Sequence, residues 1–253
     1  MEKERCKTKY PLVLVHGIGY SGDDERAYWG RTAYALEAEG ATLYFGGQPG
    51  RAGVRECAEV LRDNISQIAE RCGRVNLIAH SKGGIESRYM ISCLGMADKV
   101  ASLTTLGTPH HGVATMDAMR KIGLLPFFLF LFRSMVRLGG GNMEGSEKAL
   151  DQMTADFMGV FNEMVPDAAG VYYQSYAFDM VSGSTDPGFA FFHSVIESCE
   201  SDNDGLVSLD SARWGEFRGV YRGSDDQGIS HTQAKHDSGL FVDIVHDLKK
   251  LGY

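Results

Sequence analysis

The chain has 253 residues, of which 43% are hydrophobic and 23% charged, and its formal net charge is −8. This is the composition of a globular protein large enough to fold without a disulfide or a metal. The negative charge argues against nucleic acid as a partner, because phosphate binding depends on clustered lysine and arginine.

The N-terminal half alternates short apolar segments with amphipathic ones, which is the pattern of a parallel sheet covered by helices. Strands are expected at residues 12–15, 42–45, 75–79 and 100–106. Helices are expected at residues 23–39, 54–71 and 82–94, the first of them opened by Asp23, Asp24 and Glu25. The predicted fold class is therefore α/β, with a mostly parallel central sheet flanked by helices.

The regular alternation stops near residue 110. It resumes with expected strands at 171–178 and 219–221 and with a closing helix at 241–251. Between these parts, residues 122–132 have the sequence IGLLPFFLFLF, an apolar run too short to cross a membrane. We expect one domain over residues 1–253, with a helical cap or lid inserted at about 113–170 and no transmembrane segment.

The apolar run has two interpretations. It is either a buried cap helix or a lid that covers a site in water and lies on a lipid surface when open. Arg133 and Arg137 nearby suit a lipid–water interface, and the three glycines at 139–141 suit a hinge. We favour the lid. Its candidate substrate-contacting residues are Leu124, Phe127, Phe128 and Phe130.

The cysteines and the N-terminus bear on the compartment. None of Cys6, Cys57, Cys72, Cys93 and Cys199 has the spacing of a zinc site. We expect most of them to be buried thiols, with a single Cys57–Cys72 disulfide as the alternative. The N-terminus is charged and then enters a strand directly, without the apolar region of a signal peptide. This predicts a cytoplasmic protein, or a secreted one if a leader has been removed.

The sharpest local signal is the segment Ala79-His80-Ser81-Lys82-Gly83-Gly84, which falls between an expected strand and an expected helix. A nucleophile elbow requires this context, because a tight turn projects the serine hydroxyl above the sheet. Small residues two positions to either side let strand and helix pack closely, and Ala79 and Gly83 fill these positions. Considered alone, Ser81 has a second interpretation as an ordinary helix N-cap.

A second element supports Ser81 as a nucleophile. Acyl transfer needs an oxyanion hole of two backbone N–H groups, one from the residue after the nucleophile and one from the loop after an earlier strand. Lys82 occupies the first position, and His16-Gly17-Ile18-Gly19 follows the first expected strand, where the second donor belongs. A plain turn between strand and helix is the alternative, since such turns also favour glycine.

With these motifs the chain resembles the bacterial triacylglycerol lipases of the α/β-hydrolase superfamily. PLVLVHGIG resembles their oxyanion loop, AHSKGGIESRY their elbow, and TTLGTPHHG (104–112) the strand after the elbow. SDNDGLVS (201–208) resembles their acid turn, and GISH (228–231) their histidine loop. The segments occur in family order across nearly the whole chain, whereas residues from about 113 to 170 carry no resemblance.

The resemblance implies a catalytic triad of Ser81, Asp204 and His231, with Ile18 and Lys82 donating the oxyanion N–H groups. The order serine, acid, histidine along the chain agrees with this fold.

Other acids and histidines compete for these roles or surround them. Asp202 and Asp210 are the rival acids, and His236 is the rival base. The remaining histidines have structural expectations: loop orientation around the site for His80, His110 and His111, a buried hydrogen bond for His16, and structural or exposed positions for His193 and His246.

The resemblance also bears on metals. Many relatives hold a structural calcium with an aspartate two residues past the base, and that position is Gln233 here. Calcium prefers carboxylate oxygens, so we expect no metal or other cofactor, with a calcium site around Asp237 as the alternative.

The implied activity is hydrolysis of carboxylic esters through an acyl-enzyme on Ser81. The expected substrates are acylglycerols or other esters with apolar acyl chains, met at a lipid–water interface. An esterase or acyltransferase for small non-lipid acyl groups is the first alternative. The second is a ligand-binding protein that keeps the fold without turnover.

Overall fold

The computed structural model describes residues 4–20, 24–138 and 142–253, and these contain a six-stranded sheet in which all neighbouring strands are parallel. In spatial order the strands are β2 (Leu43–Phe45), β1 (Leu12–Val15), β3 (Val75–His80), β4 (Val100–Leu106), β5 (Tyr172–Phe178) and β6 (Glu216–Tyr221). The strands β1, β3 and β4 are buried along their whole length, as expected for parallel strands covered on both faces. The predicted α/β fold class is confirmed.

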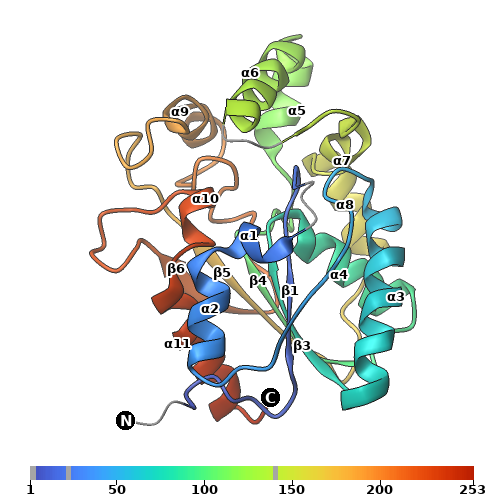
Figure 1. The fold of residues 1–253 in the computed structure, drawn as a ribbon. Helices are drawn as coiled ribbons and strands as arrows, with labels where there is room; N and C mark the ends of the chain where they lie inside the picture. The colour runs from blue at the N-terminus through green and yellow to red at the C-terminus, as the bar shows by residue number, and fades with distance from the viewer. Residues whose placement is uncertain (1–3, 21–23, 139–141) are drawn as a thin grey trace.

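Helices cover both faces of the sheet (Figure 1). On one face lie α1 (Glu25–Trp29), α2 (Arg31–Ala38) and α11 (Ser238–Lys250), joined by a core that includes Trp29 and Phe241. On the other face lie α3 (Val54–Cys72) and α4 (Lys82–Cys93), which pack on the side chains that β1 and β3 direct to that face.

A third group of helices lies above the carboxyl ends of the strands (Figure 1). The connection from β4 to β5 forms α5 (Ala114–Lys121), α6 (Leu125–Leu138), α7 (Glu147–Asp151) and α8 (Ala155–Met164). After β5 comes α9 (Ala190–Cys199), and after β6 comes the short α10 (His231–Ala234). The side chain of Phe192 on α9 packs edge-on against Phe128 on α6, so this layer draws on chain beyond residue 170.

Three sequence-based predictions of local structure are wrong. The helix expected at 23–39 is two helices, because Gly30 between them has φ 52° and ψ −126°, a conformation that favours glycine. The side chain of Asp24 caps the first of them, while Asp23 lies outside the described residues. Most of the cysteines are not buried as predicted, since Cys72 is partly exposed and Cys93 and Cys199 are exposed. The alternative Cys57–Cys72 disulfide is absent, and both thiols are free. These cysteines lie fifteen residues apart on α3, roughly 22 Å, far beyond disulfide reach.

The apolar run at 122–132 is not a single element. Ile122 ends α5, Gly123 turns the chain with φ 76°, and the remainder starts α6, which continues to Leu138. Pro126 is accommodated because it lies in the first turn of α6. The glycines at 139–141, proposed as a hinge, lie outside the described residues.

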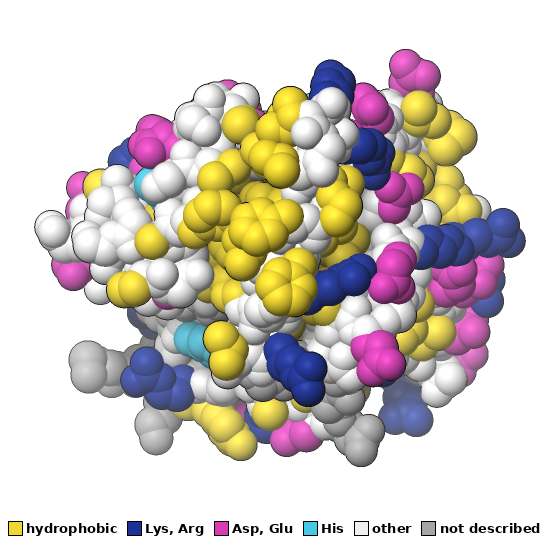
Figure 2. All heavy atoms as spheres, turned by 90° about the horizontal axis from the view of Figure 1, so that it is seen from above, with side chains coloured by type: hydrophobic (Ala, Val, Ile, Leu, Met, Phe, Trp, Pro, Cys, Tyr) yellow, Lys and Arg dark blue, Asp and Glu magenta, His cyan; other side chains and the backbone are white. Residues whose placement is uncertain are grey.

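The end of the molecule formed by these upper helices exposes apolar side chains (Figure 2). The exposed large ones here include Ile122, Leu124, Phe127, Phe130, Leu138 and Phe191. Within the described chain, no helix combines the length and the apolar character needed to span a membrane.

Candidate active site

Ser81 lies at a sharp turn between the end of β3 and the start of α4. Its backbone has φ 56° and ψ −133°, which a residue with a side chain rarely adopts. The turn is held by a hydrogen bond from the Ser81 N–H to the Leu106 carbonyl at 2.9 Å, and by one from the Thr108 hydroxyl to the Ser81 carbonyl at 2.8 Å. Within the described chain the Ser81 side chain makes no capping hydrogen bond to α4, so its hydroxyl is available for chemistry.

Close backbone packing brings the loop after β1 against this turn. A β-carbon at Gly17 would lie 2.8 Å from the Ser81 Cβ, and one at Gly83 would lie 2.5 Å from the His16 carbonyl oxygen. Neither position has room for a side chain. The Gly17–Gly19 loop and the first turn of α4 are therefore neighbours, as an oxyanion hole requires.

The oxyanion candidates are Ile18, in the loop after β1, and Lys82, the residue directly after Ser81. Among the described residues, neither backbone N–H makes a hydrogen bond. Ile18 lines the cavity beside Ser81. The Lys82 side chain turns into the interior instead, where its ammonium pairs with buried Glu86 and contacts the Cys57 thiol at 3.3 Å. This buried pair anchors the first turn of α4.

His231 and Asp204 meet as the resemblance implies. The His231 Nδ1 lies 2.6 Å from the Asp204 Oδ2, and both side chains are buried. The other carboxylate oxygen accepts the N–H groups of Leu206 and Val207 at 3.0 and 2.8 Å. The backbone N–H of His231 also donates to the Asp204 carbonyl at 2.8 Å. An ionised Asp204 thus holds the Nδ1–H tautomer and leaves Nε2 as an acceptor.

A hydrogen-bonded relay that the sequence did not reveal joins the oxyanion loop to His231. The Gly17 N–H donates to the Tyr28 hydroxyl at 3.0 Å, and that hydroxyl lies 2.7 Å from the His80 Nδ1. The His80 Nε2 lies 3.0 Å from the His231 carbonyl oxygen, which can only accept, so Nε2 carries the proton and Tyr28 donates to Nδ1. We call this chain the Tyr28–His80 relay.

The charge state of His80 supports this assignment. Burial, followed by the nearby His231 and Lys235, lowers the pKa of His80 well below its ordinary value, so the ring is neutral. The prediction that His80 orients loops around the site is confirmed by these contacts. No local sequence pattern marks Tyr28 as part of the site, because its partners are distant in sequence.

The rival acids and the rival base are all exposed. Asp202 and Asp210 are exposed, and Asp210 pairs with Arg213 at 3.4 Å. His236 is exposed and, within the described chain, has no carboxylate partner. Although much of the residue is exposed, partial desolvation of its ring and the neighbouring Lys235 lower the pKa of His236. Of the three candidate acids, the structure therefore pairs Asp204 with a histidine near Ser81.

The other histidines have structural contacts. Both ring nitrogens of His16 contact carbonyl oxygens, those of Gly17 at 2.8 Å and Gln48 at 2.9 Å. His110 is buried and bonds to the Thr105 hydroxyl at 2.9 Å, whereas His111 is exposed. His193 is buried, and the partly exposed His246 contacts a backbone carbonyl at 3.3 Å.

The residues expected near a calcium ion have other partners. The side chain of Gln233 accepts the Ser230 N–H at 3.1 Å and closes a capping box on α10. Asp237 caps α11 and accepts the Tyr221 hydroxyl at 2.7 Å. No group of three or more potential metal ligands occurs in the described ranges. These residues do not fit a calcium ion, and the expectation of no metal stays a prediction.

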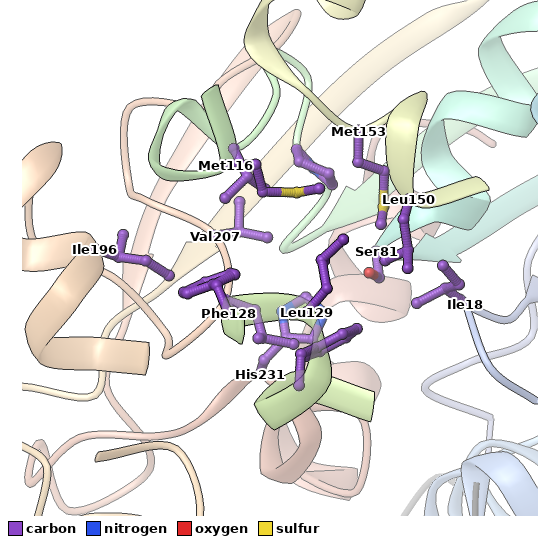
Figure 3. Close-up of a pocket in the computed structure, with 14 residues that line it drawn as sticks. Ile18, Ser81, Met116, Phe128, Leu129, Leu150, Met153, Ile196, Val207 and His231 are labelled. Atoms are coloured by element: carbon purple, nitrogen blue, oxygen red, sulfur yellow. The ribbon is translucent and has the colours of Figure 1, made fainter. Parts of the chain in front are cut away.

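Two hollows meet at Ser81 and His231. The first, which we call the apolar pocket, has a volume of about 50 Å³. Apart from Ser81 and His231 its walls are apolar and include Val113, Met116, Phe128, Leu129, Leu150 and Met153 (Figure 3). The second, the open groove, has a volume of about 1180 Å³ and a partly polar wall that includes Tyr28, His80, Asp186, Gln233, Lys235 and His236.

Three of the predicted lid residues lie on α6, where they divide between two faces, and Leu124 precedes the helix. Phe128 lines the apolar pocket together with Leu129. Phe127 and Phe130 are 58% and 64% exposed and do not reach either hollow, and Leu124 before the helix is also exposed. The structure thus brings one of the four candidate residues to Ser81.

Comparison with known proteins gives a consistent result. The palmitoyl protein thioesterase family matches residues 11–136. Triacylglycerol lipase 2 of Saccharomyces cerevisiae is 30% identical over 246 residues, which cover 92% of this chain and 68% of the yeast protein. A triacylglycerol lipase of Pseudarthrobacter phenanthrenivorans is 31% identical over 180 residues, 64% of this chain and 55% of that protein. The lipase BlEst2 of Bacillus licheniformis in its mature form has the same fold, with a TM-score of 0.74, 22% identity, and coverage of 95% of this chain and 92% of the lipase.

Proposed function

The chain belongs to the triacylglycerol lipase family of the α/β-hydrolase fold and is an ester hydrolase, in which we propose that Ser81, His231 and Asp204 form the catalytic triad. One observation carries the proposal. His231 is hydrogen-bonded through Nδ1 to Asp204 and shares a cavity with the strained Ser81. A serine, a base and an orienting acid in this order are the requirements of acyl transfer.

The reaction proceeds in two steps. The Ser81 hydroxyl attacks the ester carbonyl carbon while the His231 Nε2 takes its proton, and the N–H groups of Ile18 and Lys82 stabilise the oxyanion. His231 then gives the proton to the departing alcohol oxygen, which leaves an acyl group on Ser81. Water attacks this acyl-enzyme by the same route and releases the carboxylic acid. Asp204 stabilises the imidazolium form of His231 in both steps.

The substrates we propose are acylglycerols or other esters with apolar acyl chains. The apolar pocket beside Ser81 supports this, because it offers an acyl chain no polar partner apart from the triad itself. The pocket is small, with a volume of about 50 Å³, and movement of α6 would enlarge it for a longer chain. The net charge of −8 argues against nucleic acid as a substrate or partner.

We propose further that α6 is a lid that opens at a lipid–water interface. Its inner face closes the apolar pocket through Phe128, Leu129 and Phe132, while Phe127 and Phe130 face water. Opening the helix in water exposes a few hundred Å² of apolar surface and costs several kcal/mol at roughly 25 cal/mol per Å². A lipid surface removes that cost, because it buries both faces, and so favours the open state.

Covalent labelling tests the nucleophile. A fluorophosphonate should label the wild-type protein once, and Ser81→Ala should lose both the label and ester hydrolysis while keeping its melting temperature. The exposed Ser198 on α9 offers a matched control, since Ser198→Ala should keep the label. A folded Ser81→Ala protein with wild-type turnover would refute the assignment. Esters of increasing chain length then separate a lipase from an esterase for small acyl groups.

A further inference from the structure

The lysine that follows α10 is held on the wall of the open groove. The Lys235 ammonium lies 3.8 Å from the centre of the Tyr28 ring, and its backbone carbonyl accepts the Thr32 hydroxyl at 2.9 Å. The ring face attracts the cation, and the backbone contact fixes where the side chain starts. The ammonium group is therefore placed by the fold rather than left to sample solvent.

Among the described residues, no carboxylate pairs with Lys235. The acid on the same groove wall is Asp186, whose carboxylate already accepts the Ser230 hydroxyl at 2.7 Å and the Gly188 N–H at 3.2 Å. A partly buried ammonium on an aromatic ring is poorly hydrated. It consequently gains more from an anion than a lysine on the outer surface does.

Lys235 lies on the side of the site where the alcohol portion of the ester, the leaving group, is expected. Tyr28, which carries the ammonium on its ring, directs its hydroxyl to Gly17, whose α-carbon lies against Ser81. The alcohol oxygen of the ester must approach His231 to be protonated. Residues directly after His231, including Lys235, line the open groove and not the apolar pocket. An ester whose acyl chain enters the apolar pocket would therefore direct its alcohol portion toward the groove.

We propose that Lys235 binds an anionic group, a phosphate or a carboxylate, on the alcohol portion of the ester. The inference rests on the proposed function and narrows its substrate class to esters that carry a negative charge beyond the scissile bond. A neutral acylglycerol remains a substrate but lacks this contact. The specificity constant for an anionic ester should exceed that for its neutral counterpart by about tenfold, the gain of one charge-assisted hydrogen bond in a groove open to water.

The preference should depend on pH. Burial lowers the pKa of Lys235 to about 8, so the ammonium is charged below pH 8 and loses its proton as the pH rises through it. The titratable groups that line the same groove are those of Tyr28, His80, His231, His236 and Asp186. The ratio of the two specificity constants cancels the protonation of His231, which both esters need. That ratio should therefore be high at pH 7 and fall toward one above pH 9.

The experiment uses two chromogenic esters that differ by one carboxylate, 2-nitrophenyl octanoate and 3-octanoyloxy-4-nitrobenzoate. We expect Lys235→Met to reduce the ratio of their kcat/KM values about tenfold. The exposed Lys121 on α5 lies outside both hollows, and Lys121→Met removes the same charge as a matched control that should keep the ratio. Melting temperatures of both variants show that they are folded, and the wild-type pH profile tests the same point without any variant.

A second pair distinguishes the source of the anion. Monooctanoylglycerol and octanoyl lysophosphatidate share the acyl chain and differ by the phosphate. A preference in both pairs assigns Lys235 to anions in general, and a preference in the second pair alone assigns it to phosphate. Hydrolysis of all four esters with ratios near one, or ratios that Lys235→Met leaves unchanged, would overturn the inference but not the proposed function. Absence of hydrolysis of every ester would overturn both.

Discussion

Removing a single oxygen atom tests the Tyr28–His80 relay. Tyr28→Phe keeps the aromatic ring, its edge-on contact with Trp29 at 5.1 Å and its contact with the Lys235 ammonium. It deletes the hydroxyl that accepts the Gly17 N–H at 3.0 Å and bonds to the His80 Nδ1 at 2.7 Å. The substitution therefore separates the relay from the packing around it.

The expected loss of stability in Tyr28→Phe follows from the two groups that lose a hydrogen-bond partner. The Gly17 N–H and the His80 Nδ1 each lose a hydrogen bond in a buried place, and each such loss costs about 1–3 kcal/mol. Together they should lower the free energy of unfolding by about 2–6 kcal/mol. Removing a whole oxyanion donor lowers kcat by about 10²–10³-fold. Tyr28→Phe only loosens the loop that carries Ile18, so we expect a fall in kcat of about tenfold with little change in KM.

The assay measures kcat, KM and melting temperature on a soluble short-chain nitrophenyl ester, well below the melting temperature of the variant. Tyr34 on α2 is 61% exposed, so Tyr34→Phe is the matched control and should change none of the three. A Tyr28→Phe protein that loses stability but keeps kcat would refute the positioning role. One that keeps both stability and kcat would refute the relay itself.

Three further perturbations have expected outcomes. His231→Ala should abolish turnover as fully as Ser81→Ala, because the two residues act as one unit. His236→Ala should reduce kcat/KM far less. If His236 were the base, the kcat/KM values of the two histidine variants would rank in the reverse order. EDTA should change neither activity nor melting temperature, and a fall restored by added calcium would contradict the expectation of no metal. The double substitution Phe127→Ser and Phe130→Ser should not lower the melting temperature, because both side chains are exposed. It should reduce the increase in activity that the enzyme shows when a monomeric ester is replaced by an emulsified one. An unchanged increase in activity would count against α6 as a lid.

Much of the fold and of the site is encoded locally. The strand before Ser81, the small residues around it and the glycine loop after β1 are each visible in a few consecutive residues, because a backbone approach needs small side chains where it happens. The family predicted from these motifs is confirmed. The pairing of His231 with Asp204 needed the resemblance, since nothing near either residue specifies a partner 27 positions away.

Features made by distant contacts escaped prediction for a physical reason. Tyr28 meets His80 across 52 positions, and its role depends on how α1 lies on the sheet rather than on its neighbours in sequence. The break at Gly30 was missed because helical periodicity continues on both sides of it. Likewise, α9 joins the layer above the sheet through Phe192, which no local pattern distinguishes from an ordinary core residue.

The backbone of Ser81 has a consequence for how the protein tolerates change. Holding a residue with a side chain at φ 56° and ψ −133° costs on the order of 1–3 kcal/mol, and glycine adopts such a conformation freely. Selection for thermal stability alone would therefore favour glycine in place of the nucleophile, which gives a more stable but inactive protein. The native sequence carries the strain because the same turn points the hydroxyl into the cavity. Laboratory evolution of this enzyme consequently needs turnover in every round of screening.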